Sequence, residues 1–244
     1  MNILTVLFYQ PILNLLVGIY GILPSHDLGF AIILVTVCVK IILLPLSWKQ
    51  LQAQKQLQDI QPKLEELKKT HKDDKQGMMQ AQMILFKEHN INPLSSCLPL
   101  IIQLPFLISL FYVFMNGLKS DFSNLLYPFI QNPGHLNDMF LGVVLLTQGH
   151  NVVLAVLAGI TQFWQAKMLV TKRPPKVDGS KDEDFTVILN QQMTYMMPVI
   201  TGIMTYQFPS GLGIYWVIQS LLTICQQYVF FSHHKKIVTT AVKV

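Results

Sequence analysis

The chain has 244 residues, of which 51% are hydrophobic and only 13% are charged, and its mean hydropathy is +0.41. A soluble domain carries about 25% charged residues, so this composition argues against a soluble domain and indicates that lipid covers much of the surface. The net charge of +5 does not indicate nucleic-acid binding, because the basic residues follow the membrane topology predicted below.

The first segment, residues 1–27, is apolar but too short to cross a membrane. Pro11 and Pro24 bracket a predicted helix of roughly 20 Å, whereas the hydrocarbon core of a bilayer is about 30 Å thick. Gln10 and Asn14 lie one turn apart, opposite a face of leucine and isoleucine. We therefore expect an amphipathic helix lying in the membrane interface.

Five later stretches are apolar, contain no Asp or Glu, and are long enough to cross the hydrocarbon as helices. The predicted transmembrane helices cover residues 28–48, 94–118, 151–170, 188–207 and 211–231. Between and after them we expect a cytoplasmic hairpin at 49–93, an extracytoplasmic loop at 119–150, a cytoplasmic loop at 171–187 and a cytoplasmic tail at 232–244. Within the outer loop, residues 136–146 are apolar but short and are expected to lie in the interface.

Lysine and arginine predict the orientation of these spans. Residues 49–93 hold eight of them, the stretch from Lys167 to Lys181 holds five and the tail holds three, against Lys119 alone in the outer loop. Basic loops stay in the cytoplasm. The fold class is therefore all-α integral membrane, with five transmembrane helices, the N-terminus outside and the C-terminus inside.

The hairpin at 49–93 is predicted to consist of two helices packed on each other. Apolar residues repeat at coiled-coil spacing in the first helix, at Leu57, Ile60, Leu64 and Leu67. A facing stripe is expected from Met79, Met83 and Phe86. Asp73 or Asp74 can cap the second helix. Helix packing alone explains this pattern, although a basic hairpin beside a membrane also suits an incoming chain or a ribosome.

Lys40 is the one charged residue deep within a predicted span. A charge at such depth costs at least about 2.5–3.5 kcal/mol and normally faces a water-filled cavity or a partner. The alternative is that Lys40 extends to the cytoplasmic headgroups. Cα–Cβ bonds tilt toward the helix N-terminus, however, which here points outward. We therefore expect Lys40 to lie in a wet cavity.

Other polar residues within the spans can line such a cavity. Thr36 shares the face of Lys40 one turn earlier, and Gln103 stands among apolar neighbours in the second span. The third and fifth spans add further amides and hydroxyls, at Gln162, Gln165, Gln219, Ser220, Thr223, Gln226 and Gln227. Each alone is more often a contact between helices. Together with an unpaired cation they indicate a hydrophilic groove that opens to the cytoplasm.

Catalytic and metal-binding motifs are absent from the sequence. It has no HExxH, no GxSxG and no phosphate-binding glycine loop, and its three cysteines lack metal-ligand spacing. A proton-coupled pump would place a titratable group within its spans, but all seven histidines lie outside the predicted spans. We expect no enzymatic activity, no cofactor and no metal.

Several strings resemble the YidC/Oxa1/Alb3 family of membrane protein insertases, in order and over nearly the whole chain. They lie at residues 32–47, 61–63, 92–100, 102–105, 197–199 and 208–216. The groove of that family bears one positive residue in the first span, usually arginine. Lys40 occupies this position, so the charge is kept while the two-pronged guanidinium is lost.

The resemblance implies an insertase of a bacterial cytoplasmic (inner) membrane that acts without catalysis, as a monomer. It would take nascent membrane segments from the cytoplasm through a positively charged groove and release them laterally into the bilayer, alone or with the Sec translocon. The implied groove residues are Lys40, Thr36, Gln103, Trp216, Tyr215 and Gln219. The implied apolar surface along which a segment slides consists of Phe163, Trp164 and Met168.

The expected partners are nascent membrane proteins and the lipid bilayer, with the ribosome and the Sec translocon as further candidates and no direct contact with nucleic acid. Two other functions fit less well. A small channel or solute carrier would use the polar cavity to conduct an ion or metabolite, but the absence of acids within the spans counts against it. The second alternative is a purely structural assembly factor for membrane complexes.

Overall fold

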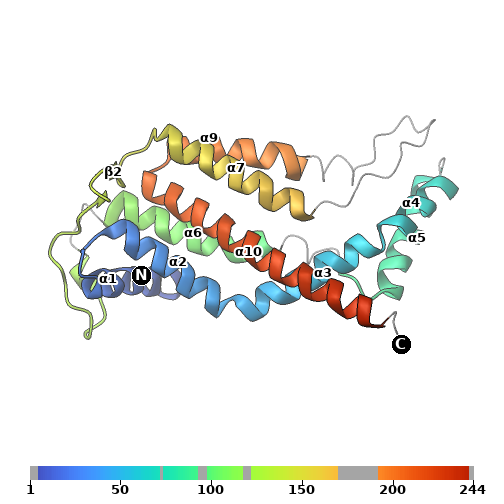
Figure 1. Cartoon of the computed structure of the whole chain (residues 1–244), viewed down its shortest axis with the longest axis horizontal. Helices are drawn as coiled ribbons and strands as arrows, with labels where there is room; N and C mark the ends of the chain where they lie inside the picture. Colours follow the sequence, from blue (N-terminus) through green and yellow to red (C-terminus); the bar gives the residue numbers. More distant parts are fainter. Residues whose placement is uncertain (1–4, 72–73, 93–97, 118–121, 170–191, 242–244) are drawn as a thin grey trace.

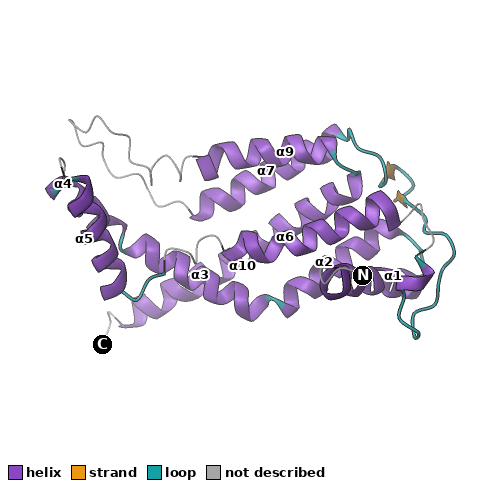
Figure 2. Cartoon of the chain, turned by 180° about the vertical axis from the view of Figure 1, so that it is seen from behind, coloured by secondary structure: helices purple, strands orange, loops and turns teal. Residues whose placement is uncertain are grey.

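The computed structural model describes residues 5–71, 74–92, 98–117, 122–169 and 192–241, and these are mostly helical (Figure 1). The predicted loop at 171–187, Asp73 and residues 242–244 of the tail fall outside the described residues. In both views α6 and α10 lie between the pair α7 and α9 on one side and α1 and α2 on the other (Figure 2). The helices α4 and α5 stand across one end of this bundle.

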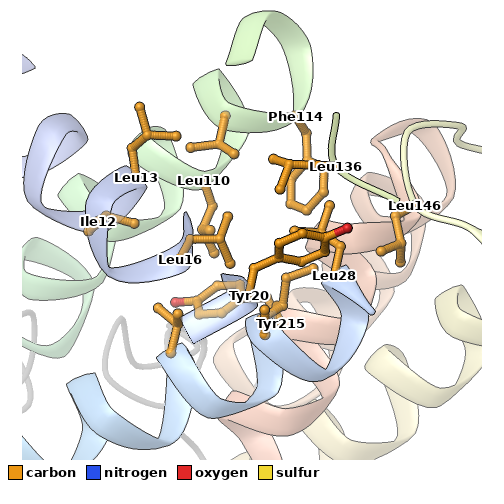
Figure 3. Close-up of a cluster of buried hydrophobic side chains, with 14 of the residues drawn as sticks. Ile12, Leu13, Leu16, Tyr20, Leu28, Leu110, Phe114, Leu136, Leu146 and Tyr215 are labelled. Atoms are coloured by element: carbon orange, nitrogen blue, oxygen red, sulfur yellow. The ribbon is translucent and has the colours of Figure 1, made fainter. Parts of the chain in front are cut away.

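The N-terminal helix packs into the bundle. A π-helical turn, η1 (Thr5–Tyr9), leads into α1 (Gln10–Ile22), whose first turn contains Pro11. Leu13 and Leu16 of α1 are fully buried, against α2 (Leu28–Ile42) and α6 (Leu98–Tyr112). A π-helical turn, η3 (Val113–Gly117), extends α6. Figure 3 shows how apolar side chains from α1, α2, η3, α10 and the outer loop meet in this core.

The polar face predicted for α1 does not face the surroundings. Asn14 is only 3% exposed, donates to the Leu125 carbonyl at 2.8 Å and accepts the Tyr127 N–H at 2.6 Å. Gln10 also donates to the Leu125 carbonyl, at 3.1 Å. These backbone groups of the outer loop, around the short helix η4 (Ser123–Leu125), need partners when they are buried. The two amides therefore bind α1 to the loop instead of facing water.

The first predicted span is not one straight helix. It breaks at Leu43 between α2 and α3 (Leu44–Asp59), whose axes differ by 66°. Pro45 in the first turn of α3 has no N–H to donate to the carbonyl of Ile41, so the helix cannot continue undisturbed. Lys40 consequently lies in the last turn of α2, not in the middle of a helix that runs on to residue 48.

Part of the outer loop folds into a short strand pair. Strand β1 (Met139–Phe140) pairs antiparallel with β2 (Val144–Leu145). Asp27 ties this pair to α2, because one carboxylate oxygen accepts the Gly29 N–H at 2.7 Å and caps the helix, while the other accepts the Leu141 N–H at 2.8 Å. The apolar segment expected in the interface is thus held on the N-terminus of α2.

The hairpin consists of α4 (Gln61–Thr70), with Pro62 in its first turn, and α5 (Lys75–Glu88), capped by Asp74 through the Gly77 N–H at 2.9 Å. Its buried residues are Ile60, Leu64, Leu85 and Ile91, with Leu57, Leu67 and Phe86 packed against them. Of the predicted facing stripe, Phe86 packs in this cluster, whereas the prediction is wrong for Met79 and Met83. Met79 and Met83 are 60% and 55% exposed, because the register of α5 turns Leu85 toward α4 instead.

The remaining helices are α7 (Val152–Leu169), the π-helical turn η5 (Gln192–Met196) with α9 (Met197–Gln207), and α10 (Ser210–Ala241). Gly159 and Gly202 let α7 and α9 pack closely, since a Cβ at Gly202 would lie 3.3 Å from the carbonyl oxygen of Ala155. Among the described residues, Val152–Leu169 and Ser210–Ser232 are long and apolar enough to cross a membrane, and the bent pair α2–α3 is a third candidate.

Candidate functional site

A chain of polar side chains connects α2, α6 and α10 inside the bundle. The ammonium of Lys40 donates to the Thr223 hydroxyl at 2.9 Å, and that hydroxyl donates to the main-chain carbonyl of Gln219 at 2.7 Å. The side-chain amide of Gln219 donates to the Gln103 side-chain oxygen at 3.1 Å. The Gln103 amide in turn donates to the Tyr215 hydroxyl. We call these five residues the polar chain.

The positive end of the polar chain has spare hydrogen-bonding capacity. The ammonium of Lys40 carries three donors, and one of them has a described partner. The ion pair between described residues joins Lys55 to Asp59, so within the described part of the chain no carboxylate neutralises Lys40. The last turn of a helix carries partial negative charge, which favours a cation there. The charge is thus supported by α2 and remains available to a ligand.

Tyr215 joins the polar chain to the apolar core. It is 1% exposed and lies among the apolar side chains of the core (Figure 3). Its ring packs against Phe106, with the ring centroids 5.0 Å apart. Its hydroxyl accepts a hydrogen bond from the side-chain amide of Gln103, so the aromatic ring is buried while its polar end keeps a partner. The polar chain therefore ends where the core begins.

The other predicted groove residues lie beside the polar chain. Thr36 is 2% exposed and donates to the Ile32 carbonyl of its own helix at 2.7 Å, so its hydroxyl is not part of the chain. Trp216 is partly exposed on α10. A second polar contact joins α10 to α7, where the Ser220 hydroxyl donates to the Gln162 side-chain oxygen at 3.2 Å.

Sequence reasoning named Thr223 only as one of several polar residues and did not pair it with Lys40. A signal existed, because Tyr215, Gln219 and Thr223 recur every four residues and so share one face of α10. Gln227 continues this spacing and is 1% exposed, and its side-chain oxygen has no hydrogen-bond partner within the described residues.

The three residues predicted as a sliding surface do not lie together on one exposed face of α7. Trp164 is 58% exposed, and Met168, one turn later, is partly buried. Phe163 instead turns toward η5 and packs against Tyr195, with ring centroids 5.9 Å apart. Of the three, Trp164 alone is exposed.

The site offers hydrogen-bond donors and acceptors in apolar surroundings. Within the described residues no three His, Cys, Asp or Glu side chains gather to hold a metal. Amides, hydroxyls and one ammonium can hold water or a polar segment inside the bundle, where such groups otherwise lose several kcal/mol each.

Comparison with known proteins places the chain in a family. The family profile described as "60Kd inner membrane protein" matches residues 19–237. The chain belongs to this family, the YidC/Oxa1/Alb3 family. It is accordingly a multi-pass helical protein of a bacterial inner membrane and not an enzyme.

Relatives within the YidC/Oxa1/Alb3 family differ in length. The chain is 35% identical over 202 residues to a membrane protein insertase YidC of Fusobacterium nucleatum. The aligned residues cover 83% of this chain and 85% of that protein. It is 37% identical over 203 residues to a membrane protein insertase YidC of Clostridium tetani, covering 83% and 81%. A relative of the same name in Haemophilus influenzae is 34% identical over 222 residues, which amount to 91% of this chain but 36% of that protein.

Proposed function

We propose that this chain is a membrane protein insertase. It takes nascent membrane segments from the cytoplasm through the groove that the polar chain lines, and releases them laterally into the bilayer, alone or with the Sec translocon. The observation that carries the proposal is the polar chain itself, with Lys40 at its end and no described carboxylate to neutralise it, in a chain of the YidC/Oxa1/Alb3 family.

The free donors of Lys40 and the amides of Gln103 and Gln219 replace part of the water that surrounds the polar flank of a substrate. An acidic flank is additionally attracted by the ammonium. The apolar segment meanwhile enters the lipid past Trp164 and Met168, and its burial supplies about 25 cal/mol per Å². No nucleotide is needed. The basic hairpin, α4 and α5, would meet the nascent chain or the ribosome first.

The proposed topology has five spans, with residues 28–48, 94–118, 151–170, 188–207 and 211–231 crossing the membrane, the N-terminus outside and the C-terminus inside. Single cysteines at Asp74, Gly179 and Ser232 are expected to react with an impermeant maleimide only from the cytoplasmic side, and one at Asn132 only from outside. Asp74, Asn132 and Ser232 are exposed, whereas Gly179 lies outside the described residues. Labelling of Gly179 from outside would contradict five spans.

Reconstitution separates insertion from transport. Purified protein in liposomes is expected to insert a single-span substrate without a nucleotide and to leave the flux of small ions and metabolites at the level of empty liposomes. The substrate's protease-protected fraction and the release of an entrapped solute measure the two activities. Flux without insertion would instead indicate the channel or solute carrier, and neither activity would indicate the assembly factor.

A further inference from the structure

A groove on the exposed surface of the helix pair α7 and α9 has no role in the proposed insertion path. Its volume is about 470 Å³, within the range of about 300–1,000 Å³ typical of ligand pockets. Val156, Ile160 and Phe163 of α7 line one wall, and Tyr195 and Val199 lie on the other. We call it the α7–α9 groove. Figure 1 shows the two helices side by side at the edge of the bundle.

Glycines form the floor of the groove. Gly159 of α7 and Gly202 of α9 both line it and bring the two backbones close, because a Cβ at Gly159 would already lie 3.4 Å from the carbonyl oxygen of Pro198. The walls are bulky and exposed, with Ile160 and Val199 at 56% and 60%. The result is a shallow, open apolar groove between two ridges.

One end of the groove is positively charged. Val156, Ile160, Phe163 and Lys167 follow at intervals of four, three and four residues and so lie on one face of α7. The Lys167 ammonium stands 5.8 Å from the centroid of the Phe163 ring, and Phe163 packs against Tyr195, which is exposed. The Lys167 ammonium and the Tyr195 side chain therefore lie at the same end of the apolar groove.

The groove and the Lys167 ammonium beyond Phe163 together span about one leaflet of a bilayer. From Val156 to Lys167 the helix rises about 16 Å at 1.5 Å per residue. The hydrocarbon of one leaflet is about 15 Å thick, half of the whole core. In the proposed topology Lys167 lies at the cytoplasmic end of α7, which is the level of the headgroups of that leaflet.

We propose that the α7–α9 groove binds one anionic phospholipid of the cytoplasmic leaflet. Its phosphate contacts the Lys167 ammonium and the Tyr195 hydroxyl, and one acyl chain lies over Gly159 and Gly202. The transmembrane helix of a substrate is the alternative occupant, and the crosslinking experiment below distinguishes it from the lipid.

The charge distinguishes an anionic lipid from a zwitterionic one. Phosphatidylglycerol presents a net negative charge to Lys167, whereas the amine of phosphatidylethanolamine offsets its own phosphate. One basic residue at an anionic surface contributes about 1 kcal/mol, so the preference is expected to be about fivefold. The acyl chain contributes equally for both lipids.

Native mass spectrometry of the purified, detergent-solubilised chain tests this with the two phospholipids carrying identical acyl chains. The wild type is expected to retain one phosphatidylglycerol about fivefold better than phosphatidylethanolamine. Lys167→Gln should lower retention of phosphatidylglycerol to the level of the other lipid, and Lys167→Arg should keep the preference. Equal retention of the two lipids by the wild type, or an unchanged preference in Lys167→Gln, would overturn the proposal.

Two tryptophan substitutions test the position of the acyl chain. Val199→Trp should fill the groove and lower retention of both lipids, while Leu157→Trp, at an exposed position of α7 outside the groove, should not. If Val199→Trp fails to fold, Tyr195→Phe at an exposed site is the substitute. It should lower retention of both lipids, because both carry the phosphate that the Tyr195 hydroxyl contacts. Equal retention by Leu157→Trp and the groove variant that folds would show that the lipid binds elsewhere.

A photoreactive residue at Val199 decides between occupants. It should crosslink to phosphatidylglycerol in membranes, with or without a substrate being inserted. Crosslinking to an inserting substrate in place of lipid would assign the groove to the substrate and overturn the proposal. Lipid retention is measured on protein without a substrate. A failure of the lipid proposal therefore leaves the insertion assay unaffected, and a failure of the insertion assay leaves the lipid proposal unaffected.

Discussion

Replacement of Lys40 by leucine is expected to slow the insertion of substrates with acidic outer tails and to spare those with neutral tails. A unit charge about 10 Å from the ammonium, at an effective dielectric constant of about 20, interacts with it by about 1.7 kcal/mol, which corresponds to about a 17-fold slower rate. Reconstituted insertion of paired single-span substrates that differ only in tail charge measures the effect.

Three variants control this experiment. Lys40→Arg keeps the charge and should retain insertion, while Lys40→Glu should be slower than Lys40→Leu because it repels acidic tails. Lys49→Leu removes an equal charge at an exposed position of α3 and should behave like the wild type. Lys40→Leu itself should fold as well as the wild type, since it removes a partly buried charge. If the leucine variant inserts both substrates as fast as the wild type, the electrostatic role of Lys40 is wrong.

The second large effect is expected at Gly211, at the start of α10. A Cβ added there would lie 2.1 Å from the tip of the Phe114 ring, and Phe114 is 1% exposed, so the ring has little space to move. Overpacking of this kind costs about 1–3 kcal/mol. Gly211→Ala should therefore lower the melting temperature of the purified protein by about 2–4 °C per kcal/mol.

Gly21→Ala is the matched control, because a Cβ at Gly21 of α1 meets nothing within 4 Å. Alanine is favoured over glycine in helices by about 1 kcal/mol, so this variant should be as stable as the wild type or more so. Adding Phe114→Leu to Gly211→Ala should recover part of the loss by shortening the obstructing side chain. A melting temperature for Gly211→Ala equal to that of Gly21→Ala would contradict the close contact.

Much of this architecture is predictable from hydropathy, because apolar stretches free of acids have few alternatives to helices in a membrane. The stretches at 151–170 and 211–231 correspond to α7 and to the first part of α10. Polar residues in such stretches are costly to bury in lipid, so Lys40, Gln103 and Gln219 are predictable as functional candidates from the sequence. Their order in the polar chain depends on how three helices rotate against one another, and no single segment encodes that rotation.

The errors have local causes. Pro45 lies within the first predicted span, but a hydropathy average depends on composition alone. It does not register that proline lacks the backbone N–H needed to continue the helix from α2 into α3. Asn14 was assigned to a polar face because its partners, the backbone groups of Leu125 and Tyr127, lie more than a hundred residues away. On α5, methionine and leucine are equally apolar, so periodicity could not tell which of them faces α4.

The bend at Leu43 also limits how far the first span reaches across a bilayer. The 15 residues of α2 rise about 22 Å. Of α3 only Leu44–Trp48 is apolar, and at 66° this part advances about 3 Å along the axis of α2. The resulting apolar reach of about 25 Å falls short of a hydrocarbon core about 30 Å thick, and lipids accommodate such a hydrophobic mismatch by thinning locally. The bilayer is therefore expected to be thinnest beside Lys40, where headgroups and water come closest to the cation and a polar tail has the least hydrocarbon left to cross.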